Sequence, residues 1–232
     1  LGIDEVIKLA SNENPLGASP RAMAALNGRL QLAERYPDGS GFALKQSLAR
    51  RWGVDSTQIT LGNGSNEVLE LLARIFAGPG DEIMFSAHCF VVYPIAAQVV
   101  GATPVSVPAC NWGHDLDAMA AAITERTRVI YLANPNNPTG TWVNDDTLVR
   151  FLNRVPAHVL VALDEAYFEY AERDGYPNGL SLLGQYDNLV VTRTFSKLHG
   201  LAALRIGFSV SNPTIADLMN RVRMPFNVND LG

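Results

Sequence analysis

The chain of 232 residues lacks the features that mark several classes of protein. Its two cysteines, Cys89 and Cys110, have neither metal-ligand nor redox spacing, which excludes a disulfide-rich or zinc-bound domain and indicates a reducing compartment, the cytoplasm. No apolar run approaches the roughly 18 residues that span a bilayer. A net charge of −5 gives no basic surface for nucleic acid. We therefore expect a soluble enzyme that binds neither membrane nor nucleic acid.

Lysine is also scarce, and Lys197 has the most informative surroundings of the three. It follows the apolar strand predicted at Leu189-Val190-Val191, and such strands place ligand-binding residues just beyond their carboxyl ends. An amine desolvated there can attack an aldehyde, whereas a solvated surface lysine, the alternative reading, would stay charged. Thr194, Ser196 and Arg205 supply the hydroxyls and guanidinium that suit a phosphate. An aldehyde with a phosphate suggests pyridoxal phosphate.

Two other apolar strands each end in a polar group. Residues 129–133 lead into a proline-rich loop that holds the Asn137 amide rigidly, and residues 159–163 lead into Asp164 and Tyr167. A carboxylate directly after a buried strand is costly unless it is paired, and a protonated pyridine nitrogen would pair with Asp164. Asn137 and Tyr167 could then donate to the phenolic oxygen of the ring. The alternative for Asp164 is a helix N-cap.

A strand predicted at Thr57–Leu61 runs into a glycine turn and then a helix with apolar spacing at 68–76. Free N–H groups and the positive end of the helix dipole make such a helix start an anion site, which suits a phosphate. Phe90, after another strand, could stack on the pyridine ring or be an ordinary core aromatic.

The same turn nearly fits a dinucleotide-binding fingerprint. Gly62 and Gly64 are in place, and Asp81 stands at a plausible distance for a ribose contact. Glu67, however, occupies the position of the third glycine, so a nicotinamide enzyme is the weaker alternative.

Together these motifs resemble the pyridoxal-phosphate aminotransferases of fold type I, and within them most closely the histidinol-phosphate aminotransferases. The resemblance covers nearly the whole chain. It is carried by residues 9–17, 35–38, 62–67, 134–140, 164–167 and 194–205.

The resemblance implies a role for each matching residue. Lys197 would bond the cofactor aldehyde, Asp164 would pair with the pyridine nitrogen, and Phe90 would stack on the ring where many relatives carry tyrosine. Tyr36 would reach a phosphate in the neighbouring subunit, which implies a homodimer with shared active sites. The donors to the phenolic oxygen would be Asn137 and Tyr167, and the phosphate would be held by Gly64, Ser65, Asn66, Thr194, Ser196 and Arg205.

Alternating strands and helices from about residue 57 to 211 predict an α/β fold. The resemblance makes this a three-layer aminotransferase large domain with a mostly parallel central sheet. We expect an N-terminal arm and the first helix of the small-domain side at 1–35, and the cofactor-binding large domain, cut short at its C-terminus, at 36–232. The C-terminal small domain is expected to be absent, leaving the arm poorly held. Asp115 and Asn144 are predicted helix N-caps.

The activity that the resemblance implies is transamination between histidinol phosphate and 2-oxoglutarate in histidine biosynthesis. Three alternatives stay open: a related aromatic aminotransferase, a threonine-phosphate decarboxylase, and a non-catalytic regulatory domain that binds pyridoxal phosphate.

Overall fold

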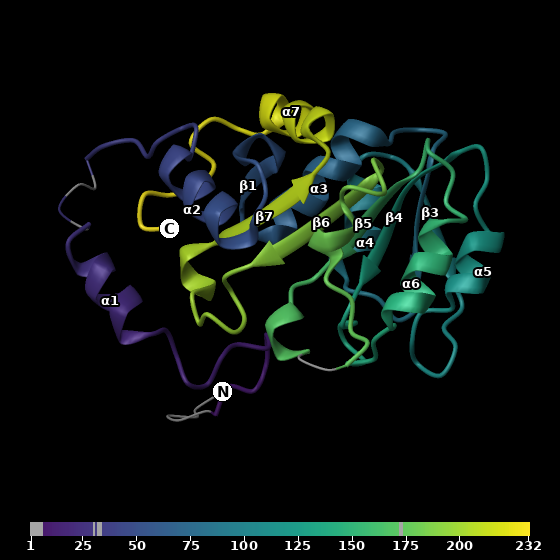
Figure 1. Cartoon of the computed structure of the whole chain (residues 1–232), viewed down its shortest axis with the longest axis horizontal. Helices are drawn as coiled ribbons and strands as arrows, with labels where there is room; N and C mark the ends of the chain where they lie inside the picture. The colour runs from purple at the N-terminus through teal and green to yellow at the C-terminus, as the bar shows by residue number, and fades with distance from the viewer. Residues whose placement is uncertain (1–6, 30, 32–33, 172–173) are drawn as a thin grey trace, which may run out of the picture.

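The computed structural model describes residues 7–29, 31, 34–171 and 174–232. Within them the central feature is a seven-stranded sheet with the strand order β1-β7-β6-β5-β4-β2-β3 (Figure 1). Only β7 runs against the other strands of this sheet, so the predicted, mostly parallel arrangement is confirmed. The strands are β1 Ile59–Asn63, β2 Glu82–Ser86, β3 Thr103–Val107, β4 Thr127–Ala133, β5 Leu160–Asp164, β6 Leu189–Thr194 and β7 Ile206–Ser211.

Helices cover both faces of the sheet and complete the predicted three layers. One face packs against α2, α5 and α6, and the other against α3, α4 and α7. None of the helices in the described parts of the chain is long and apolar enough to cross a membrane. In the described residues the α-helices are α1 Pro20–Asn27, α2 Phe42–Trp52, α3 Ser65–Phe76, α4 Val92–Val99, α5 Leu116–Ala121, α6 Asp145–Leu152 and α7 Pro213–Val222. The 3₁₀ turns include η2 Ser56–Gln58, η3 Phe168–Tyr170, η4 Gly179–Leu182 and η5 Ala202–Leu204.

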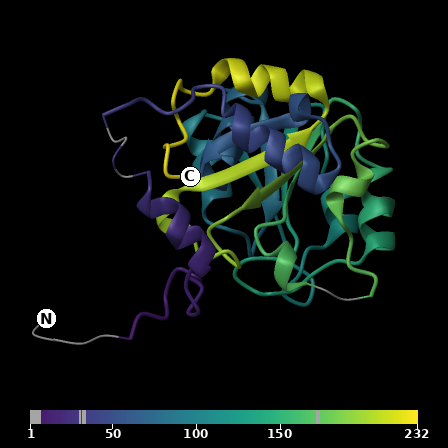
Figure 2. The same ribbon diagram turned by 60° about the vertical axis from the view of Figure 1, so that its left-hand side comes forward.

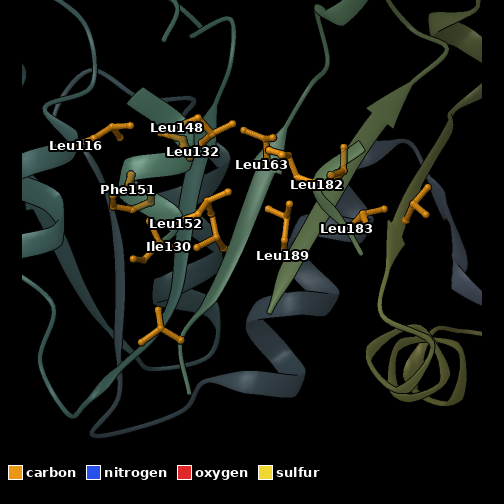
Figure 3. Packing of buried hydrophobic residues seen from close by; sticks show 14 of the residues in the cluster. Leu116, Ile130, Leu132, Leu148, Phe151, Leu152, Leu163, Leu182, Leu183 and Leu189 are labelled. Atoms are coloured by element: carbon orange, nitrogen blue, oxygen red, sulfur yellow. The ribbon is translucent and has the colours of Figure 1, made fainter. Parts of the chain in front are cut away.

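Side chains along the central strands alternate between two apolar cores. In β4, Ile130 and Leu132 belong to the core under α5 and α6, whereas Val129 and Tyr131 belong to the core under α3 and α4. Figure 3 shows the first core, in which Phe151 and Leu152 of α6 and Ile130 of β4 belong to one cluster. Because both faces are covered, the strands are held in fixed positions, and so are the residues that follow their carboxyl ends.

Local sequence signals explain most helix starts and one error in the predictions. Asp115 and Asn144 cap α5 and α6 by accepting from backbone N–H groups, as predicted. The strand predicted at Thr57–Leu61 is wrong at both ends: β1 begins at Ile59 and continues to Asn63. Residues 56–58 form η2 instead, because Asp55 caps it with a capping box that the apolar pattern does not reveal.

The N-terminal segment, residues 7–19, lies near the edge where β4, β5 and β6 end, and α1 stands apart from the sheet in both views (Figure 1, Figure 2). Contrary to the expectation of a poorly held arm, the segment before α1 makes specific contacts. The Asn14 side chain donates to the carbonyl of Leu198 at 2.7 Å. Gly200, with φ of +67°, passes so close to Gly17 that a Cβ there would lie 2.4 Å from the Gly17 oxygen. The division at residue 35 stays a prediction.

Candidate active site

A cavity of about 520 Å³ opens at the carboxyl ends of β4, β5 and β6. It lies where parallel strands and the start of a helix meet, which is the usual ligand position in open α/β sheets. Ten of the twelve residues predicted from the sequence line it, although they are spread over most of the chain. They are Ser65, Asn66, Phe90, Asn137, Asp164, Tyr167, Thr194, Ser196, Lys197 and Arg205.

One end of the cavity has the chemistry of an anion site. The 12-residue helix α3 begins there, and no described side chain caps its first N–H groups. Its N-cap, Gly64, has φ of +77°, and a Cβ at this position would lie 2.1 Å from Nη2 of Arg205. Glycine therefore lets the guanidinium approach the helix start, where two sources of positive charge add.

Hydroxyls extend this end of the cavity. Thr194 Oγ1 donates to Ser196 Oγ at 3.0 Å, and Arg205 Nη1 reaches the same Ser196 oxygen at 3.4 Å while also donating to the carbonyl of Ala202 at 3.0 Å. Gly64 N donates to the carbonyl of Arg205 at 2.8 Å, which ties the helix start to the loop before β7. The arrangement fits a phosphate group better than a carboxylate, because donors approach from three separate segments.

At the other end lies a buried carboxylate. Asp164 is only 5% exposed and accepts from the hydroxyls of Tyr93 at 2.9 Å and Thr192 at 3.0 Å. Burial raises the pKa of Asp164, and these two hydrogen bonds act against the rise. The helix-cap alternative is wrong, because the next helical turn, η3, begins after Tyr167 without a side-chain cap.

Lys197 projects into the cavity from the loop after β6. It is partly exposed, its Nζ lies 5.4 Å from the centre of the Tyr167 ring, and it donates to the carbonyl of Ser11 at 3.1 Å. Asn12 in the same segment donates to the Tyr167 hydroxyl at 2.8 Å. The N-terminal segment thus contacts both the lysine and the tyrosine.

Phe90 and Asn137 line the wall between these two ends. Phe90 follows β2 and meets the Tyr93 ring edge-on, with centroids 5.8 Å apart. Asn137 follows β4, as the apolar pattern predicts, and is partly exposed. An apolar ring surface and a carboxamide therefore flank the space between the lysine and the carboxylate.

Two predicted residues lie outside the cavity lining. Gly64 forms its edge through the contact with Arg205 described above. Tyr36 is 83% exposed and stacks on Phe226 with ring centroids 4.8 Å apart. Tyr36 therefore does not reach the cavity of its own chain.

The dinucleotide alternative gains no support from the geometry. Asp81 precedes β2 and so lies at the edge of the sheet opposite the cavity, where it pairs with Arg128 at 3.0 Å. Glu67 accepts from the backbone N–H of Asn63 at 2.6 Å and from Asn227 at 2.7 Å. Asp81 is therefore not placed to bind a ribose at the glycine turn, and Glu67 stands where the fingerprint needs a glycine.

Sequence reasoning missed four residues at the site. Tyr93 and Thr192 hold Asp164, and Ser11 and Glu13 line the cavity from the N-terminal segment. The signal for Tyr93 was its position three residues after Phe90, in the segment that follows β2.

The chain belongs to the aminotransferase class I and II family, whose family model matches residues 4–232. It is 62% identical over 226 residues to histidinol-phosphate aminotransferase 2 of Pseudomonas fluorescens strain Pf-5, covering 97% of this chain and 61% of that protein. It is 59% identical over 233 residues to the protein of the same name from Pseudomonas aeruginosa, covering 100% of this chain and 63% of that one.

A solved structure agrees with this assignment. The histidinol-phosphate aminotransferase of Sinorhizobium meliloti, in complex with pyridoxal-5'-phosphate, superimposes with a TM-score of 0.91 at 32% identity, covering 95% of this chain and 60% of that one. The chain thus spans about 61% of the length of the Pf-5 relative. L-threonine-O-3-phosphate decarboxylase from Porphyromonas gingivalis shares the fold, with a TM-score of 0.85 at 24% identity.

Proposed function

We propose that this chain carries the cofactor site of a pyridoxal-phosphate-dependent aminotransferase that acts on histidinol phosphate and 2-oxoglutarate in histidine biosynthesis. One observation carries the proposal: a single cavity holds the lysine Lys197, the buried carboxylate Asp164 and the anion site at Arg205. A ligand with an aldehyde, a basic ring nitrogen and a phosphate matches all three groups. The names of the relatives support the choice of substrate.

The residues present fit the cofactor. Arg205, the α3 start and the hydroxyls of Thr194 and Ser196 would hold its phosphate, and Gly64 leaves the space that the guanidinium needs. Phe90 would lie against its ring. When bound, pyridoxal phosphate accepts the electrons released when a proton leaves the α-carbon of an amino donor.

The protein groups supply binding and proton transfer. The Lys197 amine would bond the cofactor aldehyde and, once freed by an amino donor, would act as the acid-base group that takes a proton from the donor and returns it. A positioned acid-base group of this kind contributes roughly 10² to 10⁴ in rate. Asp164 would hold a negative charge against the ring nitrogen, while Asn137 and Tyr167 would donate to the ring oxygen.

The proposed protein works in the cytoplasm as a homodimer. The exposed Tyr36 supports the second point, because it lies on the surface outside its own cavity, where a partner chain could receive it.

The proposed substrate is tested by an amine-donor screen with the full-length protein, following glutamate formed from 2-oxoglutarate. We expect kcat/KM for histidinol phosphate to exceed that for phenylalanine or tyrosine by at least about 100-fold. The proposed donor carries a phosphate of its own, and charged groups that bind it, separate from the anion site at Arg205, would be left unpaired by donors that lack one. Preference for an aromatic amino acid, or carbon dioxide released from threonine phosphate, would contradict the assignment. Binding of cofactor without turnover of any donor would favour a regulatory domain.

The shared active site is tested by mixing two variants, Tyr36→Phe with Lys197 intact and Lys197→Ala with Tyr36 intact. The Tyr36→Phe homodimer should bind the cofactor about tenfold more weakly, since it loses one hydrogen bond to a charged phosphate. In the heterodimer the only lysine-bearing site receives a normal tyrosine from its partner, so its affinity, measured by cofactor titration, should match that of the wild type. Affinity equal to that of the Tyr36→Phe homodimer would place the tyrosine in its own chain's site.

A further inference from the structure

The hydrogen bonds to Asp164 have a function of their own. We propose that Tyr93 and Thr192 form a two-donor holder that keeps the Asp164 carboxylate ionised and oriented, which makes Tyr93 a positioning residue for the reaction. The proposal rests on the proposed function, in which Asp164 faces the ring nitrogen of the cofactor. Each carboxylate oxygen has one hydroxyl donor: Oδ2 accepts from Tyr93 at 2.9 Å and Oδ1 from Thr192 at 3.0 Å.

The Tyr93 hydroxyl is fixed in direction by the packing of its ring. Tyr93 is completely buried, stacks on Tyr131 with centroids 4.8 Å apart at 10°, and meets Phe90 edge-on. A ring held on two sides cannot turn its hydroxyl away from Asp164. The segment after β2 therefore positions both a cavity wall, through Phe90 just before α4, and the donor behind the carboxylate, through Tyr93 in the first turn of α4.

Thr192 is fixed by the sheet. It lies directly opposite Asp164 in the parallel pairing of β5 with β6 and is completely buried. Its hydroxyl is therefore held at hydrogen-bond distance by the backbone register. Between them, a helix and a neighbouring strand determine where the carboxylate points.

The two hydroxyl donors determine whether a proton shared by Asp164 and the pyridine nitrogen resides on the acid or on the nitrogen. A buried carboxylate next to a pyridine nitrogen competes with it for one proton, and burial favours the neutral pair with the proton on the acid. Hydroxyl donors stabilise the ionised carboxylate, so they leave the proton on the nitrogen. Burial and the Asp164 charge raise the pKa of Tyr93, which therefore stays a donor. Among the described residues, the other titratable groups whose charges act on this pair include Lys197, Cys89, Tyr131 and Tyr176.

The test compares Tyr93→Phe with Tyr131→Phe in the full-length holoenzyme. Both remove one hydroxyl from a completely buried, stacked ring, but the Tyr131 hydroxyl donates to the carbonyl of Leu69 at 2.6 Å and not to Asp164. For Tyr93→Phe we expect kcat to fall roughly 10- to 100-fold, as the loss of a hydrogen bond to a charged group implies, with KM for the donor changed less than about threefold.

A spectroscopic readout separates positioning from general damage. With Tyr93→Phe the midpoint of the pH titration of the bound cofactor's visible absorbance should move to higher pH, because a less positive ring releases its other proton less readily. Tyr131→Phe should leave both the midpoint and kcat unchanged. Thr192→Val should raise the titration midpoint and lower kcat, as Tyr93→Phe does. Thr192→Ser keeps a hydroxyl and should therefore retain the wild-type midpoint and kcat.

A wild-type midpoint and kcat in Tyr93→Phe would overturn the inference, and so would an equal shift in Tyr131→Phe. The proposed function is tested separately, by the amine-donor screen above. If Asp164→Asn turns over like the wild type, the role proposed for the carboxylate is wrong, and so is the inference that rests on it.

Discussion

Replacing Lys197 by alanine is expected to abolish transamination, with a loss of at least about 10² to 10⁴ in kcat, because the variant lacks the amine that moves the proton. The same lysine should be labelled when borohydride reduces the holoenzyme, and peptide mass mapping would locate the pyridoxyl group. This expectation rests on the cavity lining, because Lys197 is the only lysine among the described residues that lines the cavity.

The chain provides a demanding control in Lys45. Burial and Arg223 lower the pKa of Lys45, which makes its amine more nucleophilic than that of an ordinary surface lysine. Its amine nevertheless donates to Asn220 at 3.0 Å and does not line the cavity. Lys45→Ala should keep the label on Lys197 and most of the activity. A label on Lys45, or on Lys8, would refute the assignment of Lys197.

Arg205→Ala is expected to weaken cofactor binding by at least about 100-fold, measured by titrating the apoprotein with pyridoxal phosphate. Hydrogen bonds to a charged group contribute about 1.5 to 3 kcal/mol each, and the guanidinium fork can make two. The cofactor affinity of Arg205→Lys should lie between those of the wild type and Arg205→Ala, because lysine keeps the positive charge but lacks the two-pronged guanidinium.

Arg128→Ala is the matched control for this arginine. Arg128 is paired with Asp81 at the far edge of the sheet, so its loss should leave cofactor affinity unchanged. Equal affinity for Arg205→Ala and wild type would show that the phosphate is held elsewhere.

The sequence predicts the part of the site that follows from strand ends. Apolar runs locate β4, β5 and β6, and parallel pairing brings the residues after them to one edge, which is why Asn137, Asp164 and Lys197 could be grouped. The polar residues of the glycine turn join them because β1 ends at the same edge.

Other contacts could not be predicted because they depend on packing between distant elements. The bond from Tyr93 to Asp164 requires α4 to lie against the sheet at a particular depth, and an apolar helix pattern gives no such depth. The contact of Ser11 with Lys197 joins residues that no periodicity relates. The direction of β7, the one antiparallel strand in the described sheet, was likewise not specified by its apolar character.

The position of β1 has a consequence for synthesis on the ribosome. Its sheet neighbour is β7, with Asn63 opposite Ile206, so β1 cannot pair until β7 has been synthesised. Pairing over such a separation is slow to form, and the early part of the chain stays exposed to misassembly in the meantime. Arg205 directly precedes β7, so the anion site is completed at the same late moment. A ligand bound there stabilises only chains in which β1 and β7 have paired, so its binding shifts the equilibrium toward the fully folded sheet.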